Sequence, residues 1–174
     1  MKKILVVVDM QNDFIDGSLG TKEAVAIVPK VVEKIKAYKA NRDAVYFTQD
    51  THDANYLETQ EGRNLPVPHC IKGTKGWALQ PEIQALAENI FEKGIFGGEE
   101  LAQTLRNMIE DPSQVEIELV GLCTDICVLS NAILLKTYMP EALIKVDAAC
   151  CAGVTPQSHN NALEAMKMCH IQII

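Results

Sequence analysis

Apolar and polar positions change period repeatedly along the chain, and these changes predict its secondary structure. Short apolar or β-branched runs predict strands at 4–8, 44–48, from 90, 116–122, 142–146 and 171–174. Apolar residues at helical spacing predict helices that start at Pro29 and that span 81–88, 101–109, 124–138 and 156–169. This alternation predicts an α/β fold with a doubly wound, mostly parallel six-stranded sheet and helices on both faces.

One segment, 51–76, has no regular period and is rich in Gly, Pro, Asn and His, so we expect a long loop there. Loops of this length in a compact domain usually carry function. The sequence contains no internal repeat, no low-complexity tract and no linker. Its 174 residues therefore predict a single domain spanning 1–174.

Composition and charge narrow the classes of function. Hydrophobic residues make up 48% of the chain and charged residues 22%, as in a globular protein with a core. The net charge of −7 argues against nucleic-acid partners, which require a basic surface. No apolar run approaches the about 18 residues of a membrane span, and the run after the two N-terminal lysines is too short for a signal peptide. We therefore expect a cytoplasmic protein without membrane contact, whose six cysteines are free thiols.

Reactive side chains follow the ends of the predicted strands. Asp9 follows the first strand, Lys93 the third, and Cys127 lies one helical turn past the fourth. In a parallel sheet these ends share one edge, where ligands bind. The helix start and Lys93 would favour a Cys127 thiolate, and Asp9 could take the thiol proton and pass it to a leaving amine. Amides near Cys123 and Cys127 could hold an oxyanion. Singly, each residue has an ordinary structural explanation; only the set indicates acyl transfer.

A second group of polar residues borders the predicted loop. Asp50, His52 and His69 offer a carboxylate and two imidazoles, which suit zinc, iron or manganese with open coordination positions. Hydrogen bonding and solvent exposure are the alternative for such residues in a polar loop. The sequence pattern alone leaves both open.

Three sequence blocks resemble the catalytic blocks of the isochorismatase-like cysteine hydrolases, and most closely the nicotinamidase-like branch. They are DMQNDF at 9–14, FEKGIFGG at 91–98 and GLCTDICV at 121–128, and the resemblance extends over nearly the whole chain. It implies a Rossmann-like three-layer fold with strand order 3-2-1-4-5-6. It also implies that Asp9 is the general base and acid, Lys93 its charge partner and Cys127 the nucleophile.

The resemblance assigns further site residues. It implies a cis peptide bond between Leu122 and Cys123, with the Cys123 N–H turned toward an oxyanion, and a ring-packing role for Phe14. It implies a divalent metal, zinc before iron or manganese, held by Asp50, His52, His69 and a further His or Glu. No histidine lies between His52 and His69, so Glu61 is the first choice for that ligand and Glu58 the second. The aromatic residue that the family often carries before the second metal histidine is missing at 65–68.

The implied reaction is hydrolysis of nicotinamide to nicotinic acid and ammonia through a thioester, which would feed NAD salvage. True isochorismatases lack the cysteine, so Cys127 favours amide hydrolysis. Family members are usually dimers or tetramers, so we expect a homo-oligomer. One alternative is a related cysteine amidase acting on another small amide, a carbamoyl or a ureido compound, which would not need the metal set. Another is a non-catalytic metabolite-binding protein on the same fold, which would not need the three catalytic side chains together.

Overall fold

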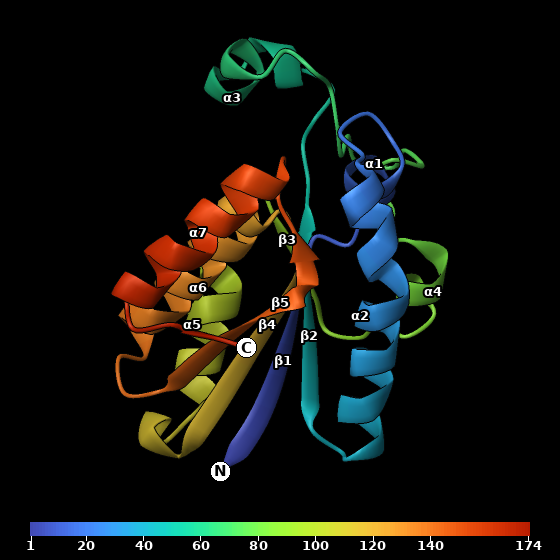
Figure 1. Cartoon of the computed structure of the whole chain (residues 1–174). Helices are drawn as coiled ribbons and strands as arrows, with labels where there is room; N and C mark the ends of the chain where they lie inside the picture. The colour runs from blue at the N-terminus through green and yellow to red at the C-terminus, as the bar shows by residue number, and fades with distance from the viewer.

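The computed structural model describes all residues from 1 to 174, and its strands form one sheet (Figure 1). The strands are β1 (Lys2–Val8), β2 (Ala44–Asp50), β3 (Ile90–Lys93), β4 (Val115–Leu122), β5 (Leu143–Ala152) and β6 (Gln172–Ile173). Their spatial order is β3-β2-β1-β4-β5-β6, and every neighbouring pair is parallel. The predicted order and the predicted α/β fold are confirmed, and the sheet is parallel throughout.

Helices cover both faces of this sheet. The α-helices are α1 (Asn12–Ile15), α2 (Lys22–Ala40), α3 (Gln60–Asn64), α4 (Pro81–Gln84), α5 (Glu99–Met108), α6 (Leu129–Tyr138) and α7 (Pro156–Met168). Shorter turns are η1 (Tyr56–Glu58), η2 (Pro112–Gln114) and η3 (Thr124–Val128), of which η3 is π-helical. Figure 1 shows α5, α6 and α7 against one face and α1, α2 and α4 against the other, with α3 standing apart at one end. None of the helices combines the length and the apolarity that a membrane span requires.

The continuous apolar run of β1 is explained by two cores that it separates. Ile4, Val6 and Val8 belong to the core beneath α5, α6 and α7. Leu5 and Val7 belong to the core beneath α2. A strand buried on both faces needs apolar residues at every position, because successive side chains point to opposite faces.

The start of α2 differs from the prediction. The helix begins at Lys22, with the Thr21 hydroxyl accepting a hydrogen bond from the Ala24 N–H at 3.0 Å, and Pro29 lies in its interior. Proline removes the bond to the carbonyl four residues earlier, which belongs to Val25. Val25 is exposed, so water can satisfy that carbonyl and the helix continues through the proline.

Two further segments are more regular or longer than predicted. The segment 51–76 contains η1 and α3 instead of a continuous loop. Strand β5 continues to Ala152 because it pairs again with the end of β4 after a register irregularity between Leu119 and Gly121. The longer strand brings its carboxyl end beside η3, at the same edge as the ends of β1, β2 and β3.

Candidate active site

Three buried side chains with complementary chemistry meet at the carboxyl edge of the sheet. Asp9 directly follows β1, Lys93 ends β3, and Cys127 lies in η3. The Lys93 Nζ lies 2.7 Å from Asp9 Oδ2 and 3.5 Å from Cys127 Sγ. Exposed fractions are 0% for Asp9, 7% for Lys93 and 5% for Cys127. The structure thus brings together an acid, a base and a thiol that are 84 and 34 residues apart in sequence.

The two oxygens of Asp9 have different partners, Thr48 at Oδ1 and Lys93 at Oδ2. The Thr48 hydroxyl donates to Asp9 Oδ1 at 2.7 Å and also lies 3.3 Å from the Asp9 N–H. Lys93 Nζ lies 2.7 Å from Asp9 Oδ2, the distance of a charge-assisted ion pair, and no other group bonds to this oxygen. A carboxylate oxygen in this state can accept a proton from the neighbouring thiol.

The ion pair sets the charges of Asp9 and Lys93. Burial raises the pKa of Asp9 above its usual value, and the charge of Lys93 opposes that rise. Burial alone would lower the pKa of Lys93, but the charge of Asp9, together with that of Asp50, outweighs it and raises this pKa. Lys93 therefore stays protonated, and its charge favours the ionised form of Asp9.

Cys127 differs from the expected thiolate. Burial, followed by the charge of Asp9, raises its pKa well above the usual value, and the charge of Lys93 does not compensate. The residue also lies in a π-helical turn rather than in the first turn of a regular α-helix. Cys127 is therefore a neutral thiol at rest, and it must lose its proton when it attacks.

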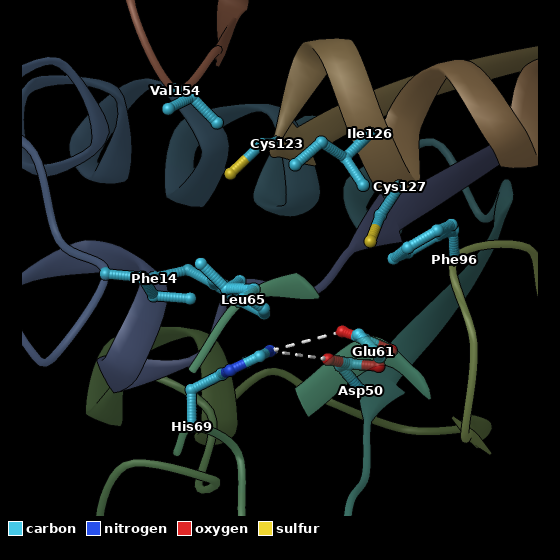
Figure 2. Close-up of a pocket in the computed structure, with 11 residues that line it drawn as sticks. Phe14, Asp50, Glu61, Leu65, His69, Phe96, Cys123, Ile126, Cys127 and Val154 are labelled. Carbon is cyan, nitrogen blue, oxygen red and sulfur yellow. Dashed lines mark ion pairs between the residues drawn. The ribbon is translucent and has the colours of Figure 1, made fainter. Parts of the chain in front are cut away.

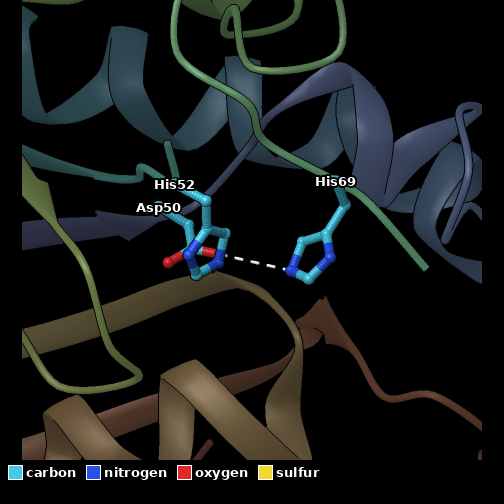
Figure 3. Close-up of side chains that lie close together, drawn as sticks. All are labelled: Asp50, His52 and His69. Atoms are coloured by element: carbon cyan, nitrogen blue, oxygen red, sulfur yellow. Dashed lines mark hydrogen bonds and ion pairs between the residues drawn. The ribbon is translucent and has the colours of Figure 1, made fainter. Parts of the chain in front are cut away.

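Three of the four predicted metal ligands, Asp50, His52 and His69, lie close together (Figure 3), and Asp50 contacts Lys93. Asp50 ends β2, and its carboxylate lies within 4.8 Å of ligand atoms of His52 and His69, with all three side chains buried. The His69 Nδ1–H donates to the Val67 carbonyl at 2.8 Å, which leaves Nε2 facing the group. A backbone bond to the far nitrogen of a histidine is typical of metal-ligating imidazoles. The donor set suits a divalent cation.

Glu61 of α3 approaches the same group. Its Oε1 lies 3.6 Å from His52 Nε2 and 3.7 Å from His69 Nε2. Glu61 stands outside the compact set of three, but its side chain is only 17% exposed and faces them. Glu58 is exposed and has no contact with either histidine. The geometry therefore favours Glu61 over Glu58.

Asp50 joins the metal-binding group to the catalytic group. Its Oδ1 lies 3.5 Å from Lys93 Nζ, while its Oδ2 lies 3.1 Å from His52 Nε2. The Gln11 side chain fixes its backbone from both sides, donating to the Asp50 carbonyl and accepting from the Asp50 N–H, each at 2.8 Å. Gln11 thereby holds the ends of β1 and β2 in register beside the site.

A cavity of about 190 Å³ lies between the two groups. Figure 2 shows Cys123, Ile126 and Cys127 on one side and Asp50, Glu61 and His69 on the other. The cavity is mostly apolar, and its walls are Phe14, Leu19, Asp50, Glu61, Leu65, His69, Phe96, Cys123, Ile126, Cys127 and Val154. The Phe14 ring lies 5.5 Å from the His69 ring. The peptide bond between Leu122 and Cys123 is cis, the form that the resemblance implies.

Some residues at the site were not predicted from the sequence. The Tyr56 ring is fully buried against both imidazoles, with ring centroids 4.8 Å from His52 and 5.0 Å from His69. Its hydroxyl donates to the Leu65 carbonyl at 2.8 Å. Phe96 supplies an aromatic wall that no pattern singled out, although it lies within the block 91–98. A lone aromatic residue in the polar segment 51–76 was the only sequence signal for Tyr56.

Comparison with known proteins gives a family match and close structural neighbours. The Isochorismatase domain family matches residues 3–174. A nicotinamidase/pyrazinamidase from Bacillus subtilis has a TM-score of 0.84 and 32% identity, with 99% of each chain covered. A pyrazinamidase from Pyrococcus horikoshii in complex with zinc has a TM-score of 0.81 and 28% identity, covering 100% of this chain and 99% of that one. An N-carbamoylsarcosine amidase from Thermoplasma acidophilum has a TM-score of 0.80 and 28% identity, covering 99% of this chain and 95% of that one.

Proposed function

The chain belongs to the isochorismatase family, and we propose that it is a cysteine-dependent amidohydrolase that converts nicotinamide and water into nicotinic acid and ammonia. The observation that carries this proposal is the contact of Lys93 Nζ with both Asp9 Oδ2 and Cys127 Sγ, directly behind the cavity wall that Cys127 forms. The nicotinamidase/pyrazinamidase from B. subtilis, 32% identical, supports the choice of substrate. Nicotinic acid is a precursor in NAD salvage, which is the role we propose for the reaction.

The first half of the reaction forms a thioester. Asp9 takes the proton from the Cys127 thiol as Sγ attacks the carboxamide carbon, and the N–H groups of Cys123 and Cys127 hold the resulting oxyanion. The carbon–nitrogen bond then breaks, and Asp9 returns its proton to the leaving nitrogen, which departs as ammonia. Lys93 remains charged throughout, which stabilises Asp9 whenever it is ionised.

The second half uses the same groups in reverse order. Asp9 takes a proton from a water molecule, and the hydroxyl attacks the thioester carbon. The carbon–sulfur bond breaks, nicotinic acid leaves, and Asp9 returns the proton to the Cys127 sulfur. A group that must act as base and acid in turn requires a pKa near the working pH, and the raised pKa of Asp9 fits this requirement.

We propose that zinc occupies the metal-binding group, with Asp50, His52, His69 and Glu61 as ligands. When bound, a divalent cation with an open position supplies a Lewis-acid contact that orients the ring nitrogen of the substrate. Two buried imidazoles and two carboxylates fit such a cation, and the zinc complex of the P. horikoshii pyrazinamidase supports zinc. The Phe14 ring and the apolar cavity wall would pack against the substrate ring.

The metal-binding group also bears on the alternative, a cysteine amidase for carbamoyl or ureido compounds. The N-carbamoylsarcosine amidase is as similar in sequence as the P. horikoshii pyrazinamidase, so identity does not separate the two. A cation-binding group facing the nucleophile across an apolar cavity favours a flat heteroaromatic amide, since such a ring offers a nitrogen for the cation. The cytoplasmic location and a dimer or tetramer stay predictions.

Replacing Glu61 by glutamine is expected to weaken zinc binding by at least about 100-fold, because the variant loses one charged ligand and even the loss of an outer-shell partner costs 10–100-fold. Glu58→Gln is the matched control: the same acid-to-amide change, three residues earlier, at an exposed side chain. Competition with a chromophoric chelator measures both affinities. Zinc affinity at the wild-type level in Glu61→Gln would exclude Glu61 as a ligand. A loss of zinc affinity only in Glu58→Gln would assign that role to Glu58.

The proposed function is tested by ammonia release from nicotinamide, measured after chelation and after zinc has been restored. We expect release by the zinc-loaded protein, a loss of at least about 100-fold after chelation, and recovery on adding zinc. N-Carbamoyl compounds serve as the comparison substrates. Faster ammonia release from these, unaffected by chelation, would contradict nicotinamide as the substrate and support the alternative.

A further inference from the structure

His159 is a partly buried titratable residue that the proposed mechanism does not use. It lies in the first turn of α7, and its Nδ1 lies 2.8 Å from the Thr124 hydroxyl. Thr124 is fully buried, directly follows Cys123, and begins the turn η3 that carries Cys127. The imidazole therefore contacts the one turn that carries both the nucleophile and the proposed oxyanion donors.

The direction of this hydrogen bond follows from the surroundings. Burial lowers the pKa of His159, and the charge of Asp125 opposes the shift only in part, so the ring is neutral near pH 7. A neutral imidazole can accept at Nδ1, and the Thr124 hydroxyl has no other hydrogen-bond partner in the structure. We assign Thr124 as the donor to His159 Nδ1, because the hydroxyl hydrogen has no other acceptor and without His159 a buried hydroxyl would be unsatisfied.

Neighbouring contacts fix His159 and η3 relative to each other. The Asp125 carboxylate accepts from the Val154 N–H at 3.1 and 3.3 Å, so the end of β5 is attached to the residue after Thr124. Gly153 packs directly against the backbone of His159, and a Cβ at position 153 would lie 2.8 Å from the backbone nitrogen of His159. Only glycine permits this approach, which places the backbone of the 153–155 connection directly against the first turn of α7. Two consecutive residues of η3 are therefore held, Thr124 by α7 and Asp125 by the connection that precedes α7.

We propose that His159 is a positioning residue, which holds η3 through Thr124 so that Cys127 and the amides of Cys123 and Cys127 stay aligned as the tetrahedral centre forms. Alignment of this kind matters more in the transition state than in the bound substrate. Its loss therefore lowers kcat and leaves KM nearly unchanged. The inference rests on the proposed function, since it concerns the same catalytic turn.

The test compares an isosteric variant without the acceptor with one that keeps it. In His159→Leu the acceptor is gone; in His159→Asn the amide oxygen can occupy the place of Nδ1. We expect kcat to fall about 10-fold or more in His159→Leu, with KM within about 2-fold of the wild type, and to recover to within about 3-fold in His159→Asn. Asn160→Ala, at the exposed neighbouring position, is the control for α7 and should match the wild type.

Thr124→Val shows whether His159 acts through Thr124. If it does, Thr124→Val lowers kcat to a similar extent, and the double variant with His159→Leu is no worse than either single one. Three results would each overturn the proposal. They are additive losses of kcat in the double variant, equal losses of kcat in His159→Leu and His159→Asn, and an unchanged kcat in His159→Leu. If thermal unfolding shows that His159→Leu does not fold, Thr124→Val serves as the test in its place, with the same expected loss of kcat and the same nearly unchanged KM.

A readout without substrate separates this inference from the proposed function. Alkylation of Cys127 by iodoacetamide, followed by mass spectrometry of the Cys127 peptide, reports the alignment of the thiol with Asp9 and Lys93. We expect the alkylation rate of Cys127 to change equally in His159→Leu and Thr124→Val and not in Asn160→Ala. If the wild type releases no ammonia from nicotinamide but these rates change as expected, the substrate is wrong and the role of His159 stands. Unchanged rates in both variants would overturn it.

Discussion

Replacing Cys127 by alanine is expected to lower kcat for ammonia release by about 10⁵-fold or more, because the proposed thioester cannot form without the Cys127 sulfur. The neighbouring thiol is a poor substitute: burial and the charge of Asp125 raise the pKa of Cys123 to about 12. Zinc affinity should be unchanged, since no ligand is altered. The loss should therefore appear in kcat while the metal-binding group stays intact.

Cys169→Ala is the matched control for Cys127→Ala, since Cys169 is an exposed free thiol at the C-terminal end of α7. It should retain wild-type kcat and zinc affinity. Residual activity above about 1% in Cys127→Ala, at full zinc occupancy, would show that the amide is attacked by another nucleophile, such as an activated water. The measurements are steady-state ammonia release and chelator competition.

Part of this site could be predicted from the sequence because of the way parallel strands end. Asp9 and Lys93 each lie at the carboxyl end of a strand, and these ends share one edge of a parallel sheet. Strand boundaries alone therefore bring the two residues close together. Cys127 lies one helical turn beyond a strand end, so the strand pattern placed it at the same edge, and the three sequence blocks then gave it the role of nucleophile.

The protonation state of Cys127 could not be predicted in the same way. The pattern suggested a helix start, where a thiolate is stabilised, but the side chain is buried and faces Asp9. Burial and the distance between charges are properties of the packed structure. The sequence named the groups that the fold brings together, whereas the raised pKa of Cys127 follows from burial and from the position of Asp9.

The metal-binding group shows the same division. Asp50 and His52 follow one strand, so their proximity was expected, whereas Glu61 and Glu58 lie three residues apart in an irregular segment. The orientation of α3 turns Glu61 toward the imidazoles, which favours it over the exposed Glu58. The position of Glu61 depends on how the segment 51–76 packs at the carboxyl edge of the sheet, which cannot be predicted from a local sequence pattern.

Replacing Asp9 by asparagine is expected to lower kcat/KM for the amide by about 10³- to 10⁴-fold, since asparagine has nearly the same shape but cannot exchange a proton. The pH profile should change as well. In the wild type, the rate falls as pH decreases through the raised pKa of Asp9, so its acid limb lies above that of an ordinary aspartate. In Asp9→Asn this limb should disappear, because no titrating carboxyl remains in that position.

The same variant is expected to make Cys127 more reactive toward an electrophile that needs no proton. After burial, the charge of Asp9 is the next cause that raises the pKa of Cys127, while Lys93 lowers it. Removing the Asp9 charge leaves Lys93 in place, so the thiolate forms at lower pH and iodoacetamide alkylates Cys127 faster at a fixed neutral pH. Asp16→Asn, at an exposed acid of the same segment, should change neither rate. If Asp9 transfers the proton, Asp9→Asn must be alkylated faster at Cys127 and must hydrolyse the amide much more slowly. A parallel loss of the alkylation rate and the hydrolysis rate would show that Asp9 only maintains the structure of the site.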